Sequence, residues 1–76
     1  MTSKHVILNT DKFSFVYVGD TEKRLYYCTP SYENGYVIIM WLGKNGIPEA
    51  IIEPINLMFS MINSGRIKVI ELIKID

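Results

Sequence analysis

The sequence predicts a small α+β domain, in which one helix packs on one face of an antiparallel, strongly bent sheet of five or six strands. Two observations favour this class. Runs rich in β-branched and aromatic residues recur along the chain with turn residues between them, whereas residues 54–64 repeat apolar side chains at helical spacing. A chain of 76 residues has room for one hydrophobic core, so residues 1–76 should form a single domain with the order β-β-β-β-β-α-β.

The first part of the chain predicts three strands. Lys4–Leu8 is a short apolar run that ends in four turn-forming residues, which indicates a first strand. Residues 13–18 are all β-branched or aromatic apart from one serine, and residues 24–29 resume this composition after a glycine-containing break. The two segments together predict an antiparallel hairpin.

The middle of the chain predicts a second hairpin. Residues 30–35 should be a loop, because Pro30 cannot donate to a sheet ladder and an Asn-Gly pair follows it. Tyr36–Leu42 has no polar residue, which is typical of a central strand covered on both faces. Gly43–Gly46 contains another Asn-Gly pair, so residues 47–52 should fold back beside this strand.

The two prolines of the following segment constrain its structure. Pro48 would confine residues 47–52 to an edge strand or a bulge. A helix starting at Pro48 is the competing interpretation, but it would place Pro54 inside the helix at a cost of about 3 kcal/mol. The strand is therefore preferred, with Pro54 at the first position of the helix that follows.

The predicted helix should end before Gly65 and bury one face. The core positions expected from helical spacing are Ile55, Met58, Phe59 and Ile62. Leu57 and Met61 lie beside that face on a helical wheel, so the apolar arc is wider than a one-sided surface helix requires.

The last segment, residues 66–76, alternates in a way that leaves both strand faces partly apolar. One helix covers only one face of the sheet, while this strand and Tyr36–Leu42 carry apolar residues on both faces. The second face should therefore be closed by barrel-like curling or by another chain.

Composition excludes several functional classes. Eight Lys and Arg residues balance eight Asp and Glu residues, so the chain lacks the basic excess that drives binding to nucleic acids or membranes. A single cysteine excludes an intrachain disulfide and a multi-cysteine metal site, and no cofactor is expected. With no signal-like N-terminus, we expect a cytoplasmic protein.

Catalysis is not expected. Cys28 and His5 are the only candidate nucleophile and base pair, and nothing in their spacing predicts contact. Regular alternation places Glu71 between Val69 and Ile73 on one face of the last strand, where a buried, unpaired carboxylate would be costly. Its candidate ion-pair partners are Arg24, Lys68 and Lys74.

Protein association is the function that the sequence favours. Zero net charge, two-faced apolar strands and a wide apolar helix predict a non-enzymatic interaction module, an inhibitor or adaptor, that forms a homodimer. High Ile, Lys and Asn usage fits an AT-rich coding genome. Small stand-alone domains of this kind are often viral or accessory proteins. The expected protein-binding residues are Trp41, Leu57, Met61, Tyr36 and Ile73.

Single-stranded nucleic-acid binding is the alternative. Strand aromatics can act as stacking platforms beside a basic spot, although zero net charge argues against this function. The residues that would serve it are Tyr17, Tyr27, Lys23 and Arg24.

Overall fold

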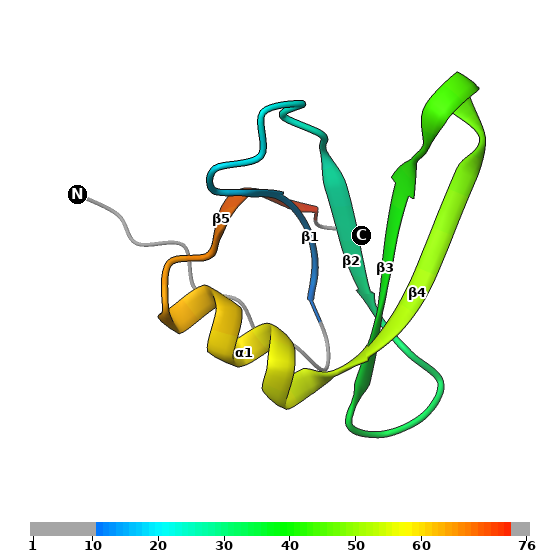
Figure 1. Ribbon diagram of the computed structural model, residues 1–76. Helices are drawn as coiled ribbons and strands as arrows, with labels where there is room; N and C mark the ends of the chain where they lie inside the picture. The colour runs from blue at the N-terminus through cyan, green and yellow to red at the C-terminus, as the bar shows by residue number, and fades with distance from the viewer. Residues whose placement is uncertain (1–10, 74–76) are drawn as a thin grey trace.

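The computed structural model describes residues 11–73, which form five strands and one α-helix (Figure 1). The strands are β1 (Lys12–Tyr17), β2 (Tyr26–Pro30), β3 (Tyr36–Leu42), β4 (Pro48–Pro54) and β5 (Ile67–Ile73). The helix α1 (Ile55–Asn63) connects β4 to β5, and a short 3₁₀ turn, Lys44–Gly46, connects β3 to β4. The α+β class expected from the sequence is confirmed.

The sheet has the strand order β4-β3-β2-β1-β5, and every neighbouring pair is antiparallel. The sheet is open, with β4 and β5 at its two edges over the described residues. The edge position of β4 agrees with the sequence, since Pro48 restricts that segment to an edge strand or a bulge. The predicted strand Lys4–Leu8 lies outside the described residues, as do residues 74–76.

The core lies between α1 and one face of the sheet, which we call the helix face. Its most buried apolar side chains are Phe13, Phe15, Cys28, Val37, Ile39, Met58 and Ile67. All the strands except β4 contribute to this set. As a result, β4 is exposed along nearly its whole length.

The orientation of α1 differs from the prediction at one residue. Met58 is fully buried, and Ile55, Met61 and Ile62 pack against the core, but Phe59 is 58% exposed. The buried arc is centred on Met58, and Phe59 lies about 100° around the helix from it. Phe59 was therefore assigned wrongly to the core face.

Two proline positions also differ from the prediction. Pro30 is not in the loop but ends β2, where it pairs with Val37. Pro54 is not the first helical residue but ends β4, and its extended backbone forms the N-cap of α1. A proline is tolerated at a strand end when no ladder hydrogen bond needs its missing N–H.

A bulge in β5 changes which way its side chains point. The register shifts so that Phe15 pairs with Val69 while Ser14 pairs with Glu71. Val69 and Leu72 consequently pack against the core, and Glu71 is exposed on the opposite face. The expectation that Glu71 shares a face with Val69 was wrong, because regular alternation does not anticipate a bulge.

Candidate protein-interaction surface

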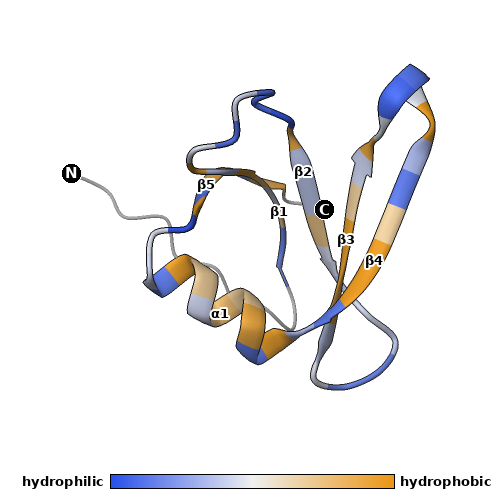
Figure 2. Cartoon of the chain, in the orientation of Figure 1, coloured by the Kyte–Doolittle hydropathy of each residue, from blue (hydrophilic) through white to orange (hydrophobic). Residues whose placement is uncertain are grey.

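The face opposite α1, the outer face, is apolar over β2, β3 and β4. Tyr27 pairs with Met40, which pairs with Ala50, so these three side chains form one row across the strands. We define the outer-face patch as five of the exposed large apolar residues on this side: Leu25, Tyr27, Met40, Leu42 and Ile52. Tyr36, also exposed on this face, lies at the other end of β3 from Leu42 and is not included. Figure 2 shows apolar residues along much of β3 and β4, interrupted by hydrophilic positions on β4.

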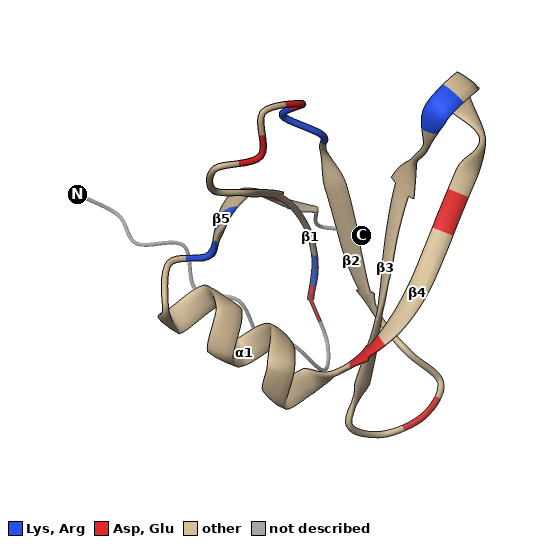
Figure 3. Cartoon of the chain, in the orientation of Figure 1, with Lys and Arg blue, Asp and Glu red and all other residues tan. Residues whose placement is uncertain are grey.

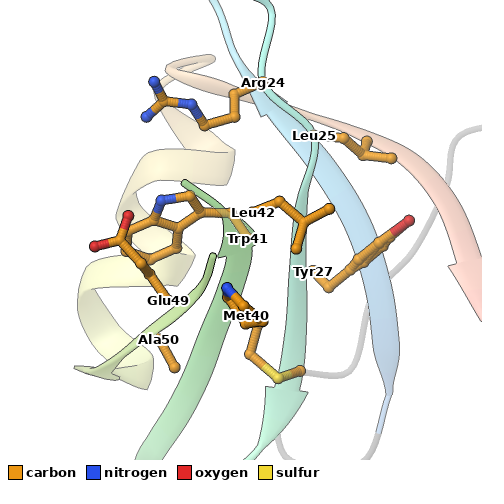
Figure 4. Close-up of a pocket in the computed structure, with 9 residues that line it drawn as sticks. Arg24, Leu25, Tyr27, Met40, Trp41, Leu42, Glu49 and Ala50 are labelled. Carbon is orange, nitrogen blue, oxygen red and sulfur yellow. The ribbon is translucent and has the colours of Figure 1, made fainter. Parts of the chain in front are cut away.

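A hollow of about 620 Å³ lies over this patch. It is lined by Leu25, Tyr27, Met40, Leu42, Pro48 and Ala50, together with Arg24, Trp41 and Glu49. The small side chain of Ala50 beside Met40 leaves room that a larger residue would fill. Figure 4 shows the Trp41 ring and the Glu49 carboxylate together on one side of β3, away from Tyr27. The hollow is therefore predominantly apolar and suits an apolar side chain from another molecule.

The outer edge of β4 is the second feature of this surface. Gly43 N–H donates to the Ile47 carbonyl at 2.8 Å, and Ile55 N–H donates to the Gly35 carbonyl at 2.8 Å. Because hydrogen bonding alternates along an antiparallel ladder, the odd-numbered residues between them face β3. The backbone groups of Ala50 and Ile52 therefore face outward.

Both ends of this edge carry a proline. Pro48 and Pro54 are even-numbered, like Ala50 and Ile52, and occupy equivalent positions along the strand. Their ring nitrogens therefore also face outward, and they offer no N–H donor. The edge thus presents two N–H groups between two prolines. Prolines at such positions limit uncontrolled pairing of an exposed strand.

The charges of β4 are both negative. Glu49 and Glu53 lie on the helix face of the strand, on either side of Ile51, which is 42% exposed. Figure 3 shows these two acidic positions on β4 and no charged residue on α1. Over the described residues the salt bridge within 4 Å joins Arg24 to Glu22, and neither carboxylate of β4 takes part in it.

No family model, curated protein or solved structure matches this chain.

The five predicted protein-binding residues are not brought together. Trp41 is half-buried on the helix face, where its ring lies 5.4 Å from Tyr26, whereas Tyr36 is exposed on the outer face. Met61 packs against the core, and Leu57 is exposed on α1. Ile73 is exposed at the end of β5, across the sheet from β4.

The residues of the nucleic-acid alternative are also divided. Tyr17 lies on the helix face, packed edge-on against Tyr26 at 4.9 Å, while Tyr27 lies on the outer face. Lys23 and Arg24 are in the turn before β2, where Arg24 pairs with Glu22. The two tyrosines cannot stack on one nucleic-acid strand, so this alternative gains no support from the geometry.

Sequence reasoning missed most of the outer-face patch. Met40, Leu42 and Ile52 were not singled out, although alternation along each strand could have placed them on one face. The sequence did not reveal the pairing register of the strands. This register brings Tyr27, Met40 and Ala50 into one row. An apolar strand alone does not reveal which of its faces the helix covers.

The position of Cys28 disfavours a role as a nucleophile. Its side chain is buried in the core, and burial raises the pKa of the thiol from 9.0 to about 12. Burial disfavours the thiolate, which is the reactive form. Among the described residues, no three His, Cys, Asp or Glu side chains cluster closely enough to hold a metal ion. No helix within residues 11–73 combines the length and the apolar character that crossing a membrane requires.

The Cys28 thiol should make the protein less stable at alkaline pH. Because the folded pKa of about 12 exceeds the ordinary value of 9.0, the unfolded chain loses this proton first as pH rises. The free energy of unfolding should fall by about 1.4 kcal/mol per pH unit between these values from this group. Urea unfolding of the parent and Cys28→Ala at several pH values above 9 measures the difference in slope. Equal slopes of unfolding free energy against pH for the two proteins would contradict the raised pKa of Cys28.

Proposed function

We propose that this chain is a non-enzymatic protein-interaction module that forms a homodimer and acts as an inhibitor or adaptor. The observation that supports this proposal is the outer-face patch. Leu42 and Ile52 are 62% and 61% exposed, and no element of the described chain covers them. Contiguous exposed apolar surface of this kind is typical of protein-binding sites.

A second copy is the simplest occupant of the outer-face patch. Twofold dimers bring the same surface of each subunit together, and an apolar patch is complementary to itself without any charge pattern. The opposite end of the outer face, near β5, carries the polar residues Lys12, Lys68 and Glu71. This division suits a dimer with an apolar centre and a polar rim.

Light scattering across a hundredfold concentration range tests the proposal. The parent chain should have twice the 8.8 kDa monomer mass, and Leu42→Lys should be monomeric because it places a charge in the apolar contact. Val18→Lys is the matched control, since Val18 is 63% exposed but lies outside the patch. Circular dichroism should show the same fold for all three proteins.

A parent protein that stays monomeric at the highest concentration would contradict the homodimer. A dimer that survives in Leu42→Lys would place the contact elsewhere on the surface. Loss of the dimer in Val18→Lys would equally exclude the outer-face patch as the specific contact.

A further inference from the structure

We infer that the outer edge of β4 binds an extended segment of another protein that alternates basic and aliphatic residues, which joins the sheet as an added strand. This inference rests on the proposed function and names the chemistry of the partner. It concerns the β4 edge, whereas the homodimer uses the outer face. The two sites can therefore be tested separately.

The outer edge of β4 can accept an added strand over a short length. The N–H and C=O groups of Ala50 and Ile52 face away from β3, as the hydrogen bonds at both ends of the ladder require. Pro48 and Pro54 offer no donors, so an added strand gains its N–H contacts between them. Main-chain hydrogen bonds of this kind give affinity without specifying a sequence.

The side chains of β4 supply the specificity. On the helix face, Ile51 lies between Glu49 and Glu53, with the exposed apolar surface of Ile51 available to a neighbour. A partner strand should place an aliphatic residue opposite Ile51 and a basic residue at the alternate position on each side. Opposite charges directly across two strands stabilise their pairing.

The negative potential at this edge is not offset by α1, which carries no charge. The charge of Glu53 also reaches the helix face. The pKa of Tyr17 is raised there by burial first, then by Tyr26 and then by Glu53. Arg24 and Lys44 border a hollow beside Glu49. Because these two positive charges lie near Glu49 and reduce its attraction for a cation, we expect Glu53 to contribute more than Glu49 to the binding of a basic partner.

A second copy of β4 fits this edge poorly in the register centred on Ile51. Pairing about a twofold axis through Ile51 would place Glu49 of each copy opposite Glu53 of the other. Like charges directly across two strands are destabilising. Charge complementarity thus favours a basic partner strand over this symmetric pair of β4 strands.

The test uses the full chain and a capped peptide, Thr-Lys-Thr-Val-Thr-Lys-Thr. Its palindromic sequence presents Lys, Val and Lys to β4 in either strand direction. Nuclear magnetic resonance titration should shift the Ala50 and Ile52 amide signals and slow their exchange with solvent. The same peptide with Glu in place of Lys should bind at least about tenfold more weakly.

Charge reversal supplies the decisive comparison. The double variant Glu49→Lys with Glu53→Lys should exchange the preference, binding the Glu peptide better than the Lys peptide. Glu71→Lys is the control, because it reverses one exposed carboxylate on β5 in the same way and should leave the preference unaltered. Ala50→Pro removes one outward donor without touching the bonds to β3, and it should abolish binding of the Lys peptide.

Three outcomes would overturn the inference. These are equal binding of the two peptides, shifts confined to β5, and protection of the Ala50 and Ile52 amides in the free chain, which would show an occupied edge. If the double variant does not fold, Ala50→Pro and the two peptides on the parent chain still decide the question. Failure here with an intact, Leu42-dependent dimer would leave the proposed homodimer standing.

Discussion

Replacing Phe15 with alanine should lower the free energy of unfolding by about 3–5 kcal/mol. The Phe15 side chain has no exposed surface, and its ring contacts Phe13, Tyr17 and Tyr26 with centroids 5.4–5.8 Å apart. Removing it would leave a cavity in the middle of the helix face. Small domains are stable by about 5–15 kcal/mol, so this loss would leave a substantial unfolded fraction. Urea unfolding followed by circular dichroism measures the change.

Tyr32→Ala is the control for this prediction. Tyr32 is also aromatic, but it lies fully exposed in the loop between β2 and β3. Its replacement should change the free energy of unfolding by less than about 0.5 kcal/mol. A similar loss of stability in both variants would contradict the placement of Phe15 at the centre of the core.

Met58→Ala should cost about 2–5 kcal/mol, because Met58 is the fully buried residue through which α1 is anchored to the sheet. Phe59→Ala, one position later on the same helix, should have a much smaller effect because that ring is mostly exposed. Thermal and urea unfolding of the two variants compare them directly. A loss for Phe59→Ala as large as that for Met58→Ala would place both side chains in the core, as helical spacing predicted, and would contradict the exposed position of Phe59.

The strands were predictable because their residues carry strong local signals. Tyr36–Leu42 became β3 with the predicted bounds, and Pro48 placed β4 at an edge. Asn45 and Gly46 both have positive φ in the turn between these strands, as the Asn-Gly signal implies. These features depend on short-range backbone preferences, which a sequence expresses directly.

The errors arose where tertiary contacts decide the outcome. Helical spacing gives an apolar arc but not its centre, so Phe59 and Met61 could not be separated without the position of the sheet. The bulge near Val69 shifts the alternation of β5 through a choice of register with β1, which moved Glu71 to the outer face.

The candidate surface was predictable in kind but not in location. Apolar residues on both faces of β3 implied an uncovered sheet face, and the structure places that face opposite α1. The paired carboxylates of β4 and the outward amides of Ala50 and Ile52 depend on strand order and hydrogen-bond parity. Both are properties of the assembled sheet rather than of any local segment.

The intrinsic fluorescence of Trp41 can report on events at the helix face of the sheet. Trp41 is the only tryptophan, its ring packs against Tyr26, and its strand neighbour is Glu49. Its emission colour and intensity should therefore respond to a ligand strand beside Glu49 or to melting of the aromatic core. Contact through the outer-face patch should change the emission less, because the Trp41 ring lies on the helix face and only borders the outer hollow. Unlabelled protein can thus distinguish occupation of one sheet face from occupation of the other.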